Sequence, residues 1–433
     1  MERYSEYKDS GVKWLGEIPS HWEVKRLGSF FFERKEKVSD KDYAPLSVTK
    51  QGIFPQLENV AKTNDGDNRK LVKEGDFVIN SRSDRKGSSG VSGLDGSVSL
   101  INIVLQPRKV LFGPFCNYLL KSYGFIEENY RNGRGIVADL WTTRYDEMKM
   151  IKVAMPSFEE QKNISSYLDA ATSKIDKAIA MQQKMIDLLN ERKQIIVQNA
   201  VTKGLDDKVE MKDSGVEWIG MIPKHWKIIR LKNVFYKRIA GSWGNEQNVS
   251  PKNTVCLRIA DFEYSRLQFK KRENYTIRSY TAKEIENKKL SKGDLLIEKS
   301  GGGEKSPVGR CVVYNLEIPD VMYANFMEKL STRGNVDSYF ICYLLSCFYS
   351  QGMIWPYVKA TTGIQNLDIA SLLSKEYIFV PPKSEQQAIV AYLDKQMQRF
   401  DSAITNCQRQ ITLLQERKQI IINEVVTGKV KVS

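Results

Sequence analysis

The glycine-rich segment around residue 301 holds the residue types that most readily act on phosphates. Gly301-Gly302-Gly303-Glu304-Lys305-Ser306 resembles a phosphate-binding loop, but Glu304 stands where that motif requires glycine, and its carboxylate would repel phosphates. Asp294 and Glu298-Lys299, just upstream, suggest a metal nuclease only faintly. The E-x-K spacing is missing there, and Asn80 occupies the corresponding place in the first half of the chain. The sequence therefore predicts neither an ATPase nor a nuclease.

Other catalytic chemistry has few candidates. The two histidines, His21 and His225, occupy the same place in a repeated P-x-H-W motif, which favours a packed or hydrogen-bonding structural role over catalysis or ligation. The six cysteines form no C-x-x-C pair, so we expect free, packed thiols. The Asn/Asp-Pro-Pro-aromatic motif with which amino-methyltransferases hold a flipped base does not occur. We therefore assign no catalytic residue and no metal site, and we expect a chain that is not itself an enzyme.

Two polar loops could instead bind nucleic acid. Residues 73–80 and 292–298 each read as a Gly-Asp turn that feeds a short buried strand, and each strand runs into a glycine-rich loop. Arginine, lysine and serine on flexible backbone are the types that meet phosphates and base edges. An exposed hairpin loop without a ligand is nearly as good an interpretation of any one residue. The DNA-contact candidates here are Arg82, Arg85, Lys86, Ser88, Ser89, Lys299, Lys305 and Arg310.

A second polar and basic segment follows later in each half, at residues 131–136 and 359–366. Because the two segments occupy matching positions, we expect them to contribute to the same surface as the loops. Their DNA-contact candidates are Arg131, Arg134, Lys359, Thr361, Thr362, Gln365 and Asn366.

Two long helices must position these loops. Apolar residues recur at helical spacing over residues 159–200 and 384–426, neither of which contains proline or glycine. Prolines precede both segments, and Gly204 or Gly428 follows them. At 1.5 Å per residue each would be a rod of roughly 60 Å whose apolar stripe packs on the other copy. We expect the polar residues Gln182, Arg192, Cys407 and Arg417 to fix the register.

The sequence contains an internal repeat. Residues 8–22, beginning K-D-S-G-V and ending in H-W, return as 212–226, and Leu188-Leu189-x-Glu191-Arg192-Lys193-Gln194-Ile195-Ile196 returns as residues 413–421. The offsets are 204 and 225, so the segments between these repeats have changed while the repeats stayed fixed. This pattern predicts one scaffold with two different reading heads, closed into a ring with approximate two-fold symmetry.

The basic charge is confined to the segments between the helices. The net charge is +14, with +5 in residues 20–155, +9 in residues 221–380 and none in the helices. Such a distribution points to a polyanion partner, although a soluble protein can also be basic incidentally. The polar beginning of the chain and the lack of an apolar run of roughly 18 residues predict a cytoplasmic protein.

Together, the K-D-S-G-V-x-W-x-G-x-I-P-x-H-W segments, the P-x-x-x-E-Q-x-x-I-x-x-Y-L-D starts at 156–169 and 381–394, and the L-L-x-E-R-K-Q-I-I runs resemble the specificity subunit of type I restriction-modification enzymes. The resemblance implies a mixed α/β fold with two target recognition domains separated by two long antiparallel helices. Each domain would read one half of a split double-stranded DNA sequence, and the helices would set the gap. The organism would be bacterial or archaeal.

The resemblance also implies partners: two modification subunits that use S-adenosylmethionine, and two restriction subunits that use ATP and Mg²⁺. These cofactors would belong to the partners, and none would bind this chain. The candidates for docking the modification subunits are Trp14, Trp22, Trp218, Trp226, Arg192, Lys193, Arg417 and Lys418. The predicted parts are 1–155, the first anchor and domain; 156–205, the central helix; 206–380, the second anchor and domain; and 381–433, the final helix.

Two other interpretations stay open. The same fold could serve a methyltransferase-only complex or a type IIB-like nuclease. A scaffold that reads no DNA would carry the same repeats with an incidental basic charge.

Overall fold

The computed structural model spans residues 1–433 and describes all of them except 1, 57–65, 136–140, 217–218, 305, 362 and 433. The chain divides into two compact units: unit 1 comprises Met1–Gln183 and Arg409–Ser433, and unit 2 comprises Lys184–Gln408. Each unit holds one anchor hairpin, one globular head and half of each long helix. The four-part division given by the sequence treats the helices as separate parts, and it stays a prediction.

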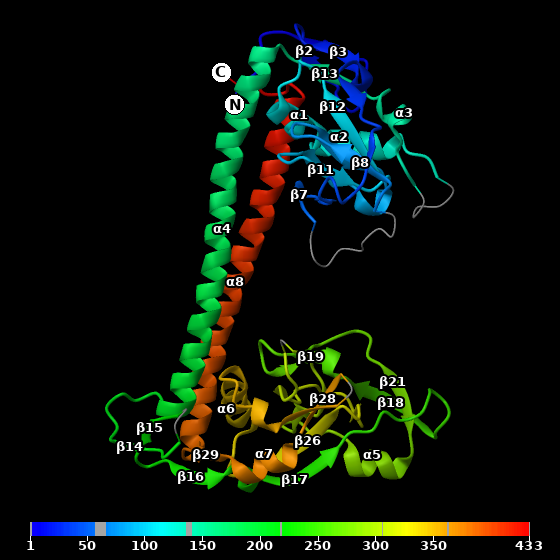
Figure 1. The fold of residues 1–433 in the computed structure, drawn as a ribbon. Helices are drawn as coiled ribbons and strands as arrows, with labels where there is room; N and C mark the ends of the chain where they lie inside the picture. The colour runs from blue at the N-terminus through cyan, green and yellow to red at the C-terminus, as the bar shows by residue number, and fades with distance from the viewer. Residues whose placement is uncertain are drawn as a thin grey trace. The chain divides into compact units, whose positions relative to one another are not determined.

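Two helices dominate the chain (Figure 1). α4 spans Phe158–Lys203 and α8 spans Lys383–Val426, so both predicted helices are confirmed. Each ends just before a glycine in the left-handed region, Gly204 at φ 77° and Gly428 at φ 76°, where a residue with a side chain would be strained. Within each unit the two helix halves pack together and run antiparallel.

Ion pairs join the two long helices, and the register role expected of the half-buried Gln182 and Cys407 stays a prediction. Lys418 on α8 contacts Asp176 on α4 at 2.7 Å in unit 1, and Lys193 on α4 contacts Asp401 on α8 at 2.7 Å in unit 2. Arg192 and Arg417 are exposed, so they lie outside the packed seam. Both pairs are related by the 225-residue offset of the repeat, so the fold repeats as well as the sequence.

The anchors are two matching β-hairpins. Anchor 1 (residues 7–22) contains β1 (Tyr7–Asp9) and β2 (Glu17–Pro19), and anchor 2 (residues 211–226) contains β14 (Met211–Asp213) and β15 (Met221–Pro223), paired in the same register. The tryptophan after each hairpin is buried, and its indole donates to the carboxylate at the start of the adjacent long helix. These bonds join Trp22 to Glu160 and Trp226 to Glu385, both at 3.0 Å.

The two histidines complete this junction. His21 Nε2 lies 3.1 Å from Glu160, and His225 Nε2 lies 2.8 Å from Glu385. The hydrogen-bonding structural role predicted for both histidines is confirmed. Each anchor is thereby fixed to the first turn of a long helix.

Head 1 (residues 23–155) is a mixed α/β domain built on two small antiparallel sheets, ordered β10-β9-β12-β4 and β11-β8-β5, with β13 pairing β3 and β6 pairing β7. Its elements are β3 (Glu23–Arg26), β4 (Phe31–Glu33), β5 (Lys37–Val38), β6 (Leu46–Val48), β7 (Ile53–Pro55), β8 (Arg69–Val72), β9 (Phe77–Asn80), β10 (Ser89–Val91), β11 (Gly96–Val98), β12 (Asn102–Pro107), α1 (Gly113–Leu120), α2 (Tyr123–Arg131), α3 (Tyr145–Met148) and β13 (Lys152–Met155).

Head 2 (residues 227–380) repeats this plan with a larger sheet, ordered β17-β26-β22-β24-β20-β19, beside β21-β18-β25, β23-β28-β27 and β16-β29. Its elements are β16 (Lys227–Arg230), β17 (Phe235–Ala240), β18 (Lys252–Leu257), β19 (Phe262–Glu263), β20 (Gln268–Phe269), β21 (Ile277–Tyr280), α5 (Ala282–Lys288), β22 (Leu295–Glu298), β23 (Ser300–Gly301), β24 (Cys311–Val313), β25 (Met322–Tyr323), β26 (Met327–Thr332), α6 (Ser338–Ser350), β27 (Val358–Thr361), β28 (Ile364–Leu367), α7 (Ile369–Lys375) and β29 (Tyr377–Val380).

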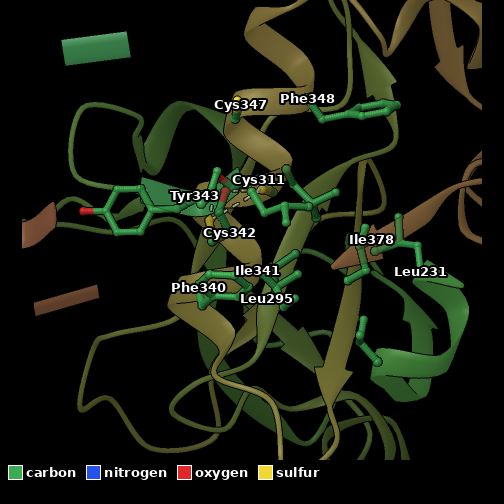
Figure 2. Close-up of a cluster of buried hydrophobic side chains, with 14 of the residues drawn as sticks. Leu231, Leu295, Cys311, Phe340, Ile341, Cys342, Tyr343, Cys347, Phe348 and Ile378 are labelled. Atoms are coloured by element: carbon green, nitrogen blue, oxygen red, sulfur yellow. Dashed lines mark hydrogen bonds between the residues drawn. The ribbon is translucent and has the colours of Figure 1, made fainter. Parts of the chain in front are cut away.

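A core of apolar side chains attaches each head to its helices. In unit 2, α6 packs on the sheet, and Figure 2 shows Phe340, Ile341 and Cys342 of α6 facing Leu295 and Cys311. All six cysteines are free thiols, five of them buried, as the sequence predicted. Burial raises the pKa of the Cys116 thiol to about 12, which makes it unreactive.

Polar contacts at equivalent places fix each head on α4 or α8. The buried amide of Gln161 accepts from the Phe112 backbone at 2.9 Å, and that of Gln386 accepts from the Asp337 backbone at 2.7 Å. Tyr118 donates to Asp169 at 2.6 Å, and Tyr343 donates to Asp394 at 2.7 Å. All of these residues are paired by the same 225-residue offset, so both heads are mounted in the same way.

Candidate nucleic-acid interface

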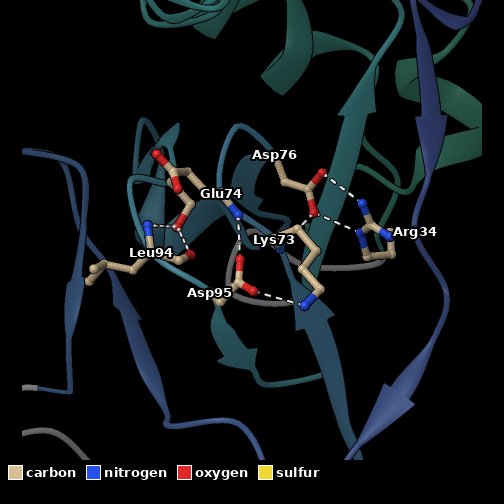
Figure 3. A network of polar contacts seen from close by, with 7 residues as sticks. Arg34, Lys73, Glu74, Asp76, Leu94 and Asp95 are labelled. Carbon is tan, nitrogen blue, oxygen red and sulfur yellow. Dashed lines mark hydrogen bonds and ion pairs between the residues drawn. The ribbon is translucent and has the colours of Figure 1, made fainter.

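The turn before each glycine-rich loop is fixed by one buried aspartate. In head 1, Asp76 accepts from the backbone of Lys73 at 2.9 Å and receives a bidentate contact from Arg34 at 2.7 and 3.1 Å. Figure 3 shows Arg34, the residue after β4, reaching this carboxylate, while Lys73 points toward Asp95. In head 2, Asp294 accepts from Ser291 at 2.8 Å and Ser331 at 2.6 Å. Asp294 therefore stabilises the turn that precedes β22.

The strand after each turn leads to its loop in the same register. In head 1, Asn80 at the end of β9 pairs with Asn102 at the start of β12. In head 2, Glu298 at the end of β22 pairs with Met327 at the start of β26. The loops therefore leave equivalent positions on the two sheets, although their sequences differ.

The structure brings the two predicted segments of each head together. In head 1, the loop pairs with residues 141–143 through two backbone hydrogen bonds of 3.0 Å. The amide of Ser83 donates to the Trp141 carbonyl, and the amide of Thr143 donates to the Ser81 carbonyl. Arg134 forms a β-bridge with Thr142, which brings the second segment to the same place. In head 2, β23 pairs with β28, which pairs with β27. We call residues 81–90, 130–135 and 141–143 loop platform 1, and residues 299–304 and 358–367, without 362, loop platform 2.

Loop platform 1 has two exposed arginines on its loop. Arg82 is exposed, and Arg85 is exposed with Asp84 3.6 Å away. Lys86 is already engaged, because it contacts Glu127 at 2.7 Å and lies 4.4 Å above the Tyr130 ring. Its positive charge is therefore partly neutralised within the head.

Two predicted serines of the same loop are enclosed. Ser88 is 5% exposed and its carbonyl accepts from the Asn80 backbone at 2.9 Å, while the fully buried Ser89 pairs with Ile79 where β10 meets β9. This placement removes both serines from the set of surface contacts. The second segment stays on the surface, where Arg131 pairs with Glu128 and the 83%-exposed Arg134 lies 3.4 Å from Glu147.

An ion pair that the sequence analysis did not foresee lies beside loop platform 2. Arg310 makes a bidentate contact with the buried Glu298 at 2.8 and 3.1 Å, and its guanidinium lies 3.9 Å above the Tyr264 ring. The Tyr264 hydroxyl donates to the same carboxylate, and burial with that neighbouring charge raises its pKa. Arg310 therefore holds the end of β22, and its assignment as a DNA contact stays a prediction.

Some of the remaining DNA-contact candidates of head 2 hold the loop in shape, and others lie on the exposed surface. Gln365 is used by the loop, since it accepts from Val308 at 3.3 Å and donates to Gly303 at 3.2 Å. Asn366 accepts from Ser300 at 2.6 Å. Lys359 is 71% exposed and contacts Asp368 at 2.7 Å, which lowers the pKa of Asp368 to about 2.

Four further candidates have little or no described structure. Lys299 is half-buried at the loop entrance, and Thr361 is the last residue of β27. Lys305 and Thr362 lie outside the described residues. The DNA-contact assignments of platform 2 stay predictions.

The docking candidates are placed in three ways. Trp22 and Trp226 are almost fully buried in the anchor junctions. Lys193 and Lys418 form the ion pairs between the two long helices, so all four residues stabilise the fold. Trp14 is partly exposed and donates to the Lys152 carbonyl at 3.2 Å, and Arg192 and Arg417 are exposed on the helices. Trp218 lies outside the described residues.

Metal sites and membrane-spanning helices are both absent from the described residues. No group of three histidine, cysteine, aspartate or glutamate side chains in this part of the chain could hold a metal ion. Among the helices described, none is long and apolar enough to cross a membrane.

Comparison with known proteins places this arrangement in a family. The profile described as "Type I restriction modification DNA specificity domain" matches residues 223–415. Over 98% of its length the chain is 24% identical to the type I restriction enzyme MjaVIII specificity subunit of Methanocaldococcus jannaschii, of which the match covers 97%. Residues 223–415 thus match the specificity domain of type I restriction-modification systems, and nearly the whole chain is similar to specificity subunits of such systems. The putative MjaX specificity subunit of the same organism is also 24% identical, over 98% of both chains.

Solved structures share the fold of this chain. A chain from a study of complex assembly and conformational transition of the type I R-M system superposes with a TM-score of 0.69 at 18% identity, covering 95% of this chain and 99% of that one. The HsdS subunit from Thermoanaerobacter tengcongensis gives a TM-score of 0.51 at 19% identity, covering 95% and 98%. The mixed α/β architecture with two long helices is thus confirmed.

Sequence reasoning missed the residues that hold the platforms in shape. Glu298 was considered only as a faint nuclease residue, because its partner Arg310 is twelve positions away, just before β24. Tyr130 and Trp141 of platform 1, whose rings lie 6.1 Å apart, were also missed. Their aromatic character was the available signal, but only the fold places them beside the loop.

Proposed function

We propose that this chain is the non-catalytic DNA reader of a type I complex, in which each head binds one half of a split double-stranded sequence. The observation that carries the proposal is the loop platform, which leaves the sheet in the same register in both heads while its residues differ. An equivalent mount with different loop side chains suits two half-sites with different base sequences. The +5 and +9 charges of the two head segments supply the attraction for phosphates.

The long helices offer two equivalent surfaces for protein partners. On α4, Leu188, Arg192 and Ile195 are exposed, and on α8 the repeated Leu413, Arg417 and Ile420 are exposed as well. Packing between the helices explains why buried positions of the repeat match, but it does not explain matching exposed positions. We call these two surfaces the α4 ridge and the α8 ridge.

Two identical ridges suit two copies of one partner. We propose that each ridge docks one modification subunit, which brings S-adenosylmethionine. Restriction subunits would add ATP- and Mg²⁺-dependent activity to the assembled complex. An exposed leucine and an exposed isoleucine, each about one turn from the arginine, give the apolar centre and the charged edge common in protein interfaces.

Methylation sequencing of a host that carries this subunit and its partners tests the reading function. We expect one split sequence with two different halves and a fixed gap, absent from the same host without the subunit. A variant with Arg82 and Arg85 replaced by alanine should alter methylation of one half only. Methylation that is unchanged on removing the subunit would support the scaffold interpretation and overturn the proposal.

A further inference from the structure

A large apolar side chain is exposed beside each loop platform, at the same position in both heads. Ile101 is 39% exposed immediately before β12, and Phe326 is 48% exposed immediately before β26. The strand registers make the two positions equivalent, since Asn102 pairs with Asn80 and Met327 pairs with Glu298. Neither side chain belongs to the described cores of its head.

Each of these residues is held rigidly to the loop by its own backbone. The Ile101 carbonyl accepts from the backbone of Ser81 at 3.2 Å and from its hydroxyl at 2.6 Å. The Phe326 carbonyl accepts from the backbones of Lys299 at 2.8 Å and Ser300 at 3.2 Å. Two hydrogen bonds therefore fix each apolar residue to the first residues of its loop.

Single exposed apolar residues are common on protein surfaces and need no ligand. These two differ because the same exposed position is bulky and apolar in both heads, while the adjoining loops differ in sequence. Their neighbours Arg82 and Lys299 are cationic, so the surroundings suit a phosphate-bearing ligand with an apolar interior. Stacked bases within a duplex provide both.

We infer that Ile101 and Phe326 are wedges that insert at a base step of each half-site and unstack it. This inference rests on the proposed reading function. Isoleucine, leucine and phenylalanine are the side chains that DNA-deforming proteins insert between bases. A partner that modifies a base must reach it outside the stack, so a wedge beside the reading loop would lower the work of extrusion.

The test uses the full chain assembled with its modification subunits and duplexes carrying 2-aminopurine at successive positions of each mapped half-site. In the unmodified complex, we expect binding to raise the fluorescence at one step in each half. Phe326→Ala should abolish the rise in one half and weaken binding about tenfold, and Ile101→Ala should do so in the other half. A mismatch at the affected step should restore most of the lost affinity, because an unpaired step costs less to open.

Leu94→Ala and Ile277→Ala are matched controls, since these apolar residues are also exposed in heads 1 and 2 but belong to neither loop platform. Both should leave fluorescence and affinity unchanged. Equal fluorescence in wild type and both wedge variants would overturn the inference while leaving the reading function intact. Loss of modification-subunit binding in the wedge variants would also overturn it, by showing that these side chains contact protein. A wild-type complex without sequence-selective binding would instead refute the proposed function itself.

Discussion

The buried pair of Arg310 and Glu298 gives the sharpest prediction about loop platform 2. Glu298 is 1% exposed and accepts from the backbone and side chain of Arg310 and from the hydroxyl of Tyr264. Arg310→Ala removes both guanidinium bonds and leaves the carboxylate buried with fewer donors. Removing one partner of a fully buried pair costs about 3–5 kcal/mol. Because the Arg310 side chain is 29% exposed, water would replace part of the interaction, and we expect about 2 kcal/mol.

This loss should appear as a lower melting temperature of unit 2. Unit 2 spans Lys184–Gln408, and a domain of this size shifts by about 2–4 °C per kcal/mol, so we expect a fall of about 4–8 °C by scanning calorimetry. The double variant Glu298→Gln, Arg310→Ala removes the unpaired charge and should regain about half of the loss. Methylation of the half-site read by head 2 should fall in Arg310→Ala, and the other half should keep its rate.

Two outcomes would refute this reasoning. A melting temperature within 1 °C of wild type in Arg310→Ala would show that the pair adds little to the fold. A double variant no more stable than Arg310→Ala would show that the loss comes from packing against Tyr264 rather than from the buried charge.

Three further predictions concern other parts of the chain. Alanine at both Arg82 and Arg85 should weaken DNA binding and reduce the slope of log K against log salt by up to about 2, measured by fluorescence anisotropy. Arg192→Glu or Arg417→Glu should each remove one of two modification subunits in native mass spectrometry, and the double variant should remove both. The pKa of Tyr118 is raised to about 12 by burial and by its bond to Asp169, so its stabilising effect should be complete below pH 10 and lost between pH 10 and 12. Tyr118→Phe should flatten that part of the stability profile.

Each of these predictions has a matched control. Lys35→Ala removes a 77%-exposed cation of head 1 and should leave the reading of both half-sites unchanged. Lys395→Glu changes an exposed charge on α8 outside the ridges and should leave both partners bound. Tyr123→Phe alters a 63%-exposed tyrosine and should leave the alkaline profile as in wild type. A change as large in the control as in the variant would contradict the corresponding assignment.

The sequence alone was sufficient for the scaffold. Local patterns encode a helix when apolar residues recur at helical spacing between a proline and a glycine, so α4 and α8 could be placed within a few residues. The internal repeat placed the two anchors and predicted their equivalence. The histidines could be assigned a structural role because their motif occurs twice.

The tertiary structure decided which candidate side chains are available. Ser88 and Ser89 have polar side chains typical of an exposed loop, but strand pairing buries them. Arg310 has the chemistry of a DNA contact, but a carboxylate from a neighbouring strand holds it. Burial and partner choice depend on residues distant in sequence, and a local pattern cannot report them. The wedge position of Ile101 and Phe326 likewise emerges only from strand register, since nothing in the two sequences marks them as equivalent.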